Sequence, residues 1–396
     1  MRMHPFPEIG GLALLVLLAG CAAPLTSSRD SGLAAGGSAD STSLFDTSRW
    51  SKQMDKATRK VTGRSINPDK ARELYSQAER SYQTAIKAGD RRSDYLTAAK
   101  GFRSAADRWP DSALEQDALF LAGESYFFAD HYPKANESYE LLLKKFPHTK
   151  YMDLVQARRF AIADYWLKLN EVDRQAFWEF NFFDKQRPMR DSFGHAVRVF
   201  DRIRIEDPTG RLADDSTLAA GNAYFTIGRY LEADNFYTDL RKTFPSSNHQ
   251  FRAHLLGVQA KLRSYQGPDY SGIPLDEAEK LIKQIRRQFP HEANEEREFL
   301  TRAYAEVRYH KALREWDMAK YYDRRGESGA ARFHYAVVAT DYAETPFSRR
   351  AADRLVELGD APDVPPQRLA WLVDLFPQEE DLQPLLADPP QETTLR

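Results

Sequence analysis

Residues 123–147 read GESYFFADHYPKANESYELLLKKFP, and this stretch decides the fold. Residues 221–245, GNAYFTIGRYLEADNFYTDLRKTFP, repeat its outline. Both begin with Gly-x-x-Tyr and end in Phe-Pro, and the first glycine and the last proline are 24 residues apart in each. Apolar residues recur at helical spacing, and proline marks the end of a helix. Each stretch therefore predicts a hairpin of two helices.

An alanine stands twelve residues before the closing proline in both stretches, and the same register runs through much of the chain. It recurs before Pro110, Pro208 and Pro290, and again before Ala343, where Pro346 is displaced. The alternative is six unrelated amphipathic helices whose alanines reflect helix propensity alone, but a shared register favours true repeats. The six expected repeat-packing alanines are Ala98, Ala135, Ala196, Ala233, Ala278 and Ala331.

This pattern resembles the tetratricopeptide repeat, in which a small residue on the second helix lets the first helix approach closely. The resemblance implies an all-α, right-handed solenoid of about six helix pairs, which we expect over residues 69–358, with a capping helix over 347–358. Ala135 and Ala196 are 61 residues apart, so the third unit carries about 25 residues more than a ~34-residue repeat.

The first residues are typical of a bacterial lipoprotein. Residues 11–18 are apolar but too short to span a bilayer, which needs ~20 apolar residues. Leu-Ala-Gly-Cys at 18–21 is similar to a lipobox, and Cys21 is the only cysteine in the chain. We therefore expect a signal peptide over 1–20 and acylation, with palmitate among the chains, at Cys21. The alternative is a non-lipidated signal peptide with a chance cysteine.

The segments that flank the repeats have their own composition. Residues 22–43 are small and polar, so we expect a flexible, disordered tether over 21–68. Ala22 follows the cysteine where an aspartate would favour the inner membrane in proteobacteria, so we expect the outer membrane. Residues 359–396 form a proline-rich C-terminal tail.

Composition and motifs argue against several function classes. The formal net charge of −2 gives no excess of positive charge for binding nucleic acid. No His-Glu-x-x-His, Gly-x-Ser-x-Gly or phosphate-binding glycine loop occurs. We expect no enzyme activity, no cofactor and no metal site. A cell-wall enzyme, the alternative of another class, would need a catalytic domain for which the tail is too short.

Residues 319–326 (AKYYDRRG) and 337–342 (VVATDY) carry a closer resemblance, together with Phe182-Phe183-Asp184 and Arg190-Asp191 in the third unit. They resemble the BamD family, the lipoprotein subunit of the outer-membrane β-barrel assembly machinery. The resemblance covers roughly residues 69–358 and the lipobox. This chain departs from that family in its sixth helix pair, its longer tether and its proline-rich tail.

The resemblance implies a lipid-anchored scaffold on the periplasmic face of the outer membrane. Its C-terminal repeats would dock on the barrel-assembly subunit, and its N-terminal repeats would receive unfolded barrel substrates. The alternative is an envelope scaffold of another system, such as cell-division coordination, pilus biogenesis or peptidoglycan attachment, because the same architecture serves them all.

Three sets of residues are candidates for partner binding. Polar residues on the first helices, Glu124, Asn222 and Arg308, are placed to line a peptide groove, although solvated polar faces are the commoner explanation. An arginine pair before Gly326 is suited to a partner carboxylate, and it equally suits a helix C-terminus. An aromatic cluster lies in the insertion, where an interface and packing against the repeats fit equally well. The arginines are Arg324 and Arg325, and the aromatic residues are Phe177, Trp178, Phe180, Phe182 and Phe183.

Overall fold

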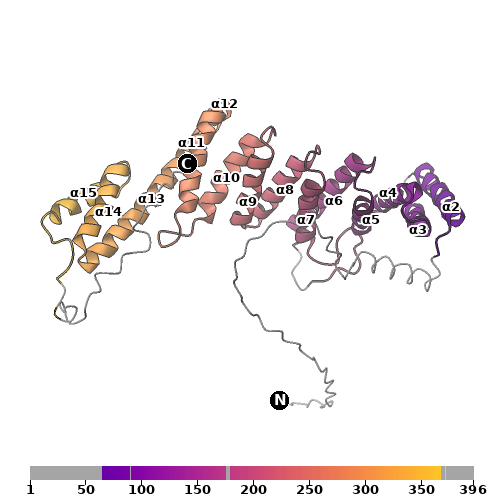
Figure 1. Ribbon diagram of the computed structural model, residues 1–396, viewed down its shortest axis with the longest axis horizontal. Coiled ribbons are helices and arrows are strands. Elements are labelled where there is room, and N and C mark those ends of the chain that lie inside the picture. The colour runs from indigo at the N-terminus through magenta and orange to yellow at the C-terminus, as the bar shows by residue number, and fades with distance from the viewer. Residues whose placement is uncertain (1–64, 90, 175–178, 367–370, 372–396) are drawn as a thin grey trace, which may run out of the picture. The chain divides into compact units, whose positions relative to one another are not determined.

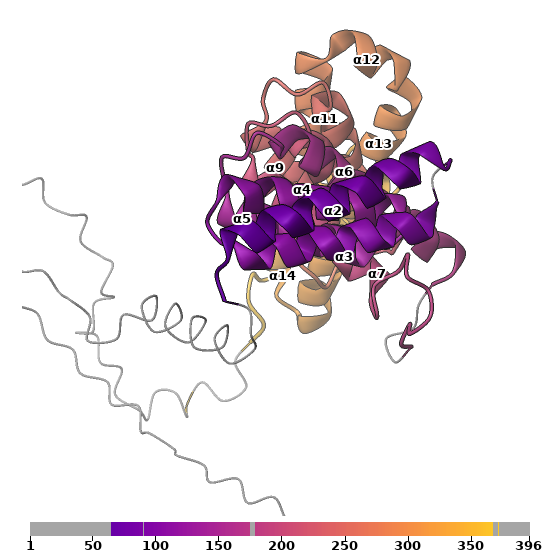
Figure 2. The ribbon, with the colours of Figure 1, turned by 90° about the vertical axis from the view of Figure 1, so that its right-hand side faces the viewer.

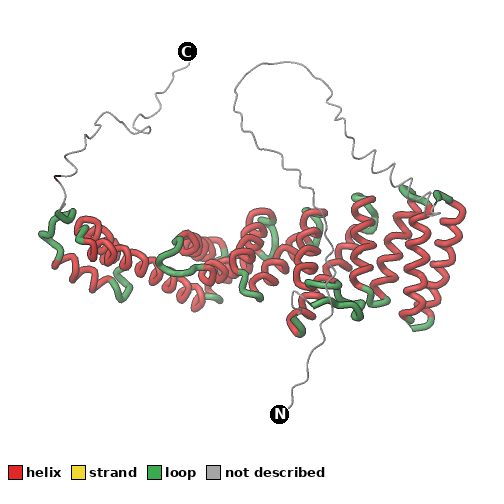
Figure 3. The backbone as a smooth tube through the Cα atoms, turned by 90° about the horizontal axis from the view of Figure 1, so that it is seen from below, coloured by secondary structure: helices red, strands yellow, loops and turns green. Residues whose placement is uncertain are grey.

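The computed structural model describes residues 65–89, 91–174, 179–366 and 371. Within these residues every regular element is a helix, as Figure 3 shows. The expected signal peptide, Cys21, nearly all of the tether and most of the tail lie outside the described residues. The helices are α2 (Pro68–Lys87), α3 (Arg92–Arg108), α4 (Ala113–Phe128), α5 (Tyr132–Lys145), α6 (Met152–Val172), α7 (Ser192–Glu206), α8 (Ala213–Thr226), α9 (Tyr230–Thr243), α10 (Gln250–Ser264), α11 (Ile273–Gln288), α12 (Pro290–Glu295), α13 (Arg297–Arg325), α14 (Ser328–Asp341) and α15 (Ser348–Glu357).

The helices pack on their neighbours in chain order, as a row of hairpins (Figure 1). The pairs are α2 with α3, α4 with α5, α6 with α7, α8 with α9, α10 with α11, and α13 with α14. Each pair also touches the next, and α15 packs on α14 at the end of the row. The prediction of an all-helical repeat stack of about six pairs with a capping helix is therefore confirmed.

Local sequence explains where the helices begin and end. Asn67 caps α2 by accepting a hydrogen bond from the backbone N–H of Lys70 at 2.9 Å, and Pro68 follows at the first helical position. Ser112 caps α4 through the N–H of Glu115 at 3.1 Å. Helices α5 and α9 both end one residue before a Phe-Pro pair, because proline cannot continue a helix.

The six alanines of the shared register all lie at the contact between helices. Each is completely buried. Their second helices bury a large apolar residue four positions further on in every pair, such as Phe102 in α3 and Ile282 in α11. A larger side chain at the alanine would push the first helix away, since protein interiors are close-packed.

The sixth pair differs from a simple repeat. Pro290 begins α12 instead of preceding a loop, and α13 then runs for 29 residues. The first half of α13 packs against α10 and α11, and the second half packs against α14. One long helix therefore connects the fifth pair to the sixth, and the spacing of the alanines did not predict this.

Candidate functional site

The loop between α6 and α7 carries aromatic side chains into solvent. We call its residues 179–191 the aromatic loop; Figure 2 shows it leaving the helical stack beside α7. Phe180 is 49% exposed, Phe182 65% and Phe183 92%. The rings of Phe180 and Phe182 stack with centroids 6.0 Å apart, and Phe183 is the most exposed of the three. The structure therefore shows that these three side chains are exposed and do not pack against the repeats.

Asn181 gives the aromatic loop its internal order. Its side-chain amide donates to the carbonyl of Asp184 at 2.6 Å, and its amide oxygen accepts from the N–H of Asp184 at 2.9 Å. Its backbone N–H donates to the carbonyl of Met189 at 2.7 Å, which joins the two arms of the loop. These bonds give backbone N–H and C=O groups of the loop hydrogen-bond partners, although the loop forms neither a helix nor a sheet.

Two aromatic residues of α6 attach the aromatic loop to the stack. The indole N–H of the buried Trp166 donates to the carbonyl of Gln186 at 2.8 Å, and the hydroxyl of Tyr165 donates to the Gln186 side chain at 2.5 Å. Burial raises the pKa of Tyr165, because it disfavours the charged phenolate. The loop that carries the exposed phenylalanines is thus attached to α6 at Gln186.

The structure places the predicted aromatic residues unequally. It brings Phe180 and Phe182 together and leaves Phe183 beside them in the same loop. Phe177 and Trp178 lie outside the described residues. Sequence reasoning did not include among the binding candidates the exposed Met189 or Arg190, whose guanidinium lies 5.5 Å from the centroid of the Phe180 ring. A methionine and an arginine next to an aromatic cluster are the signal that would have included them, since both are enriched at interfaces.

The arginine pair lies where the sequence placed it, on the last turn of α13. Both arginines are exposed. Arg325 donates to Glu327 at 2.8 Å and to the hydroxyl of Tyr321 at 2.9 Å, whereas Arg324 makes no hydrogen bond or ion pair within the described part of the chain. The helix ends in the left-handed conformation at Gly326, where φ is 76°. The aromatic loop belongs to the third pair and the arginines to the sixth, so they form two separate surfaces.

The polar residues expected to line a peptide groove are occupied by their neighbours. Glu124 is buried, accepts from Tyr139 at 2.5 Å and forms a bidentate pair with Arg158, with both nitrogens 3.0 Å from its oxygens. Asn222 accepts from a tyrosine hydroxyl at 3.0 Å, and Arg308 pairs with a glutamate at 2.6 Å. The groove prediction is wrong for Glu124, because burial leaves its carboxylate no access to a peptide.

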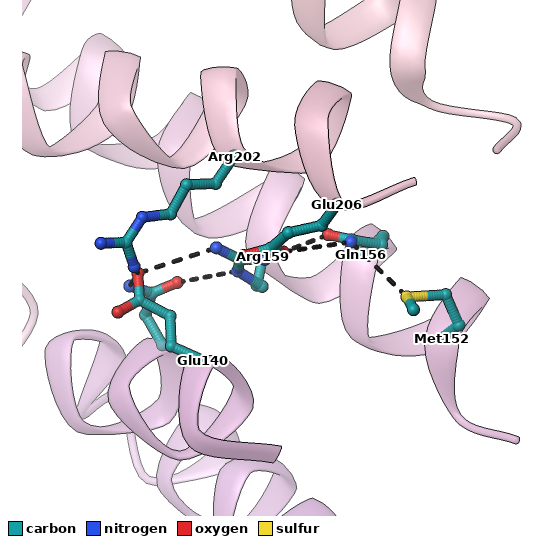
Figure 4. Close-up of polar contacts among 7 residues, drawn as sticks. Glu140, Met152, Gln156, Arg159, Arg202 and Glu206 are labelled. Atoms are coloured by element: carbon teal, nitrogen blue, oxygen red, sulfur yellow. Dashed lines mark hydrogen bonds and ion pairs between the residues drawn. The ribbon is translucent and has the colours of Figure 1, made fainter. Parts of the chain in front are cut away.

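A buried arginine that the sequence did not suggest lies between the second and third pairs (Figure 4). Arg159 of α6 is fully buried and pairs with Glu206 of α7. It also lies 3.7 Å from Glu140 of α5, which in turn pairs with Arg202 at 2.7 Å. A pocket of about 660 Å³ opens beside this cluster. Because each charge has an opposite partner within the chain, the cluster holds the pairs together and leaves no free charge for a ligand.

The same arrangement recurs further along the stack. Lys261 of α10 is buried and pairs with Asp234 of α9 at 2.6 Å, and it also pairs with Glu277 of α11. Lys311 of α13 reaches Asp276 and Glu279 of α11 at 2.7 and 2.8 Å. In each case at least one carboxylate comes from the second helix of the preceding pair, so the cation on the first helix fixes one pair against the next.

Two further features bear on the chemistry. Within the described residues no three His, Cys, Asp or Glu side chains are grouped so that they could hold a metal ion. None of the described helices has the length and apolar character needed to cross a bilayer.

Comparison with protein families identifies one stretch of the chain. Residues 117–149, which hold most of α4 and all of α5, match the tetratricopeptide repeat. A comparison with curated proteins finds no match. The match and the stacked hairpins support a protein that contains tetratricopeptide repeats, and scaffolds of this fold are typically non-enzymatic. The chain is therefore similar to scaffolds that bind other proteins.

Proposed function

We propose that this protein is a non-enzymatic scaffold, anchored by lipid to the periplasmic face of the outer membrane, that serves in β-barrel assembly. Its partners would be the barrel-assembly subunit and unfolded barrel substrates. The aromatic loop is the observation that carries the binding role, and the sequence resemblance to the BamD family supports the choice of system.

The aromatic loop has the properties of a binding surface. Phe180, Phe182, Phe183 and Met189 are four large exposed apolar side chains within this one loop. Large exposed apolar side chains gain free energy when a partner covers them, at about 25 cal/mol per Å² of apolar area. Because hydrogen bonds already order the loop, less conformational entropy is lost when a partner binds.

The membrane anchor rests on the sequence of the first 21 residues. The apolar segment, the small residues before Cys21 and the absence of any other cysteine support acylation at that position. Several acyl chains give firm attachment, whereas one gives only marginal affinity. An envelope scaffold of another system would carry the same anchor, so partner identity is what separates the two proposals.

Co-purification from detergent-solubilised membranes tests the proposal. The tagged chain is expected to recover the barrel-assembly subunit together with unfolded barrel substrates, and the double variant Phe182→Ser/Phe183→Ser is expected to recover less of the substrates. Val356→Ser, which removes an exposed apolar side chain from α15, is the matched control and should leave recovery unchanged. Retention on isolated cell wall without the assembly subunit would contradict the assignment to barrel assembly.

Fractionation of cells tests the anchor separately. Cys21→Ser should move the chain out of the outer-membrane fraction. A Cys21→Ser chain that stays in that fraction would remove lipidation from the account and leave the protein-binding role of the loop standing.

A further inference from the structure

Three cations lie on the last two turns of α13. We call Lys320, Arg324 and Arg325 the α13 basic edge; all three are exposed. Lys320 has one loose partner, Asp317, at 3.6 Å, and Arg325 is paired with a glutamate at 2.8 Å. Arg324 takes part in no hydrogen bond or ion pair within the described residues, so the edge keeps a positive charge that the helices do not neutralise.

The chain returns to this edge after α15. The N–H of Gly329 donates to the carbonyl of Asp363 at 3.0 Å, and Arg332 donates to two backbone carbonyls just after α15, each at 2.8 Å. Arg332 also pairs with the carboxylate of Asp363. A Cβ added to Gly326 would lie 3.5 Å from Pro365. The chain therefore passes the end of α13, directly next to the arginine pair, as it reaches residue 366.

The sequence that follows has the opposite charge. Residues 367–396 contain six acidic residues and two arginines, and three of the acids are consecutive at 379–381. Twelve residues lie between Pro366 and Glu379, and at ~3.3–3.6 Å per residue this length of chain keeps Glu379 within roughly 45 Å of Pro366. A segment tethered this closely reaches a millimolar effective concentration at the edge.

We infer that the acidic segment 379–381 binds the α13 basic edge of its own chain. The carboxylates cover Arg324, which the helices leave without a partner, and they carry the charge that bidentate pairing with arginine requires. The inference does not depend on the proposed role in barrel assembly.

Disulfide trapping tests this contact in the full chain. Cys21→Ser removes the single cysteine, and Met318→Cys, at an exposed position of α13, with Gln378→Cys then places one thiol near the edge and one beside the acidic segment. Mild oxidation at low salt should form the intramolecular disulfide. The rate should fall roughly tenfold at high salt, or when Glu379→Gln, Glu380→Gln and Asp381→Asn neutralise the segment, because the attraction between the segment and the exposed cations of the edge is screened or lost.

Charge reversal and a control pair make the result decisive. Arg324→Glu with Arg325→Glu should slow trapping, and adding Glu379→Arg with Glu380→Arg should restore it. Val356→Cys paired with Gln378→Cys, on the exposed face of α15, should trap slowly and without dependence on charge. Equal rates for both pairs, a rate that salt does not change, or a disulfide between two molecules would overturn the inference. If a charge-reversal variant loses helicity, the salt dependence of trapping in the two-cysteine chain that keeps Arg324 and Arg325 tests the inference instead.

Discussion

The aromatic ring of Tyr139 occupies the space that a side chain on Gly123 would fill. The fourth pair repeats this relationship, since a Cβ on Gly221 would lie 2.7 Å from the ring of Tyr237. Glycine is required on the first helix because the tyrosine of the second helix packs against its backbone. The buried hydroxyl of Tyr139 then donates to Glu124, the residue after the glycine.

Gly123→Ala is expected to destabilise the stack although alanine is the better helix former. The added methyl group meets the buried ring of Tyr139, and overpacking of this kind costs about 1–3 kcal/mol. Gly257→Ala, where the nearest atom is the end of the flexible Arg241 side chain, should cost less. Urea denaturation followed by circular dichroism measures both. A more stable Gly123→Ala would show that the ring does not pack as described.

The ion pairs of the buried Arg159 give a prediction about stability: removing the carboxylates should cost more than removing the arginine. Glu140→Gln with Glu206→Gln leaves a fully buried guanidinium without a countercharge, which costs about 3–5 kcal/mol. Arg159→Met leaves two partly exposed carboxylates that water can solvate, so its loss should be smaller. The free energy of unfolding of the two variants tests this order. A larger loss for Arg159→Met would contradict it.

The attachment of α15 should depend on pH. Arg354 donates to both oxygens of Asp323 at 2.7 and 2.8 Å, and these bonds hold the pKa of Asp323 below its ordinary value. Since the pKa is lower in the folded state, the pair stabilises the fold above the unfolded pKa of about 3.9, and this stability is lost as pH falls through the folded pKa.

Asp323→Asn should therefore lower stability at neutral pH by about 1 kcal/mol, because the pair is partly exposed, and should flatten the decline below pH 4. Asp353→Asn, which changes an exposed carboxylate on α15, is the control. Thermal unfolding across pH 3 to 7 measures the difference. Identical pH profiles for Asp323→Asn and the parent would remove the ion pair from the account.

Truncation tests whether the pairs depend only on their neighbours. A chain that ends after α11 loses α12 to α15 but keeps every contact within the first five pairs. We expect the remaining helices to stay folded and to unfold cooperatively, as in other repeat proteins. The measurement is the helical signal per residue and its thermal transition. Loss of helicity throughout the shortened chain would contradict a nearest-neighbour stack.

The sequence was most informative where local geometry repeats. The alanine register located the second helices, because a residue that must be small for packing stays at one position in every unit. The same register could not reveal that Arg159 is buried, since a charge on an otherwise apolar face is normally solvated and its partners come from α5 and α7.

The candidate site was only half predictable. Composition located the aromatic cluster, but the exposure of Phe183 depends on Asn181 and on the bond between Trp166 and Gln186, which joins residues 20 positions apart. Such a contact leaves no periodic signal. For Glu124, the bidentate pair with Arg158 comes from the next repeat, so its position on the first helix alone gave the wrong expectation.

Site-specific photo-cross-linking in cells tests the central claim most directly, which is that the aromatic loop binds other polypeptides. A benzophenone side chain in place of Phe183 should form adducts with an envelope protein, whereas the same group in place of Val356 should not. No polypeptide adduct at position 183, or equal adducts at both positions, would contradict the claim.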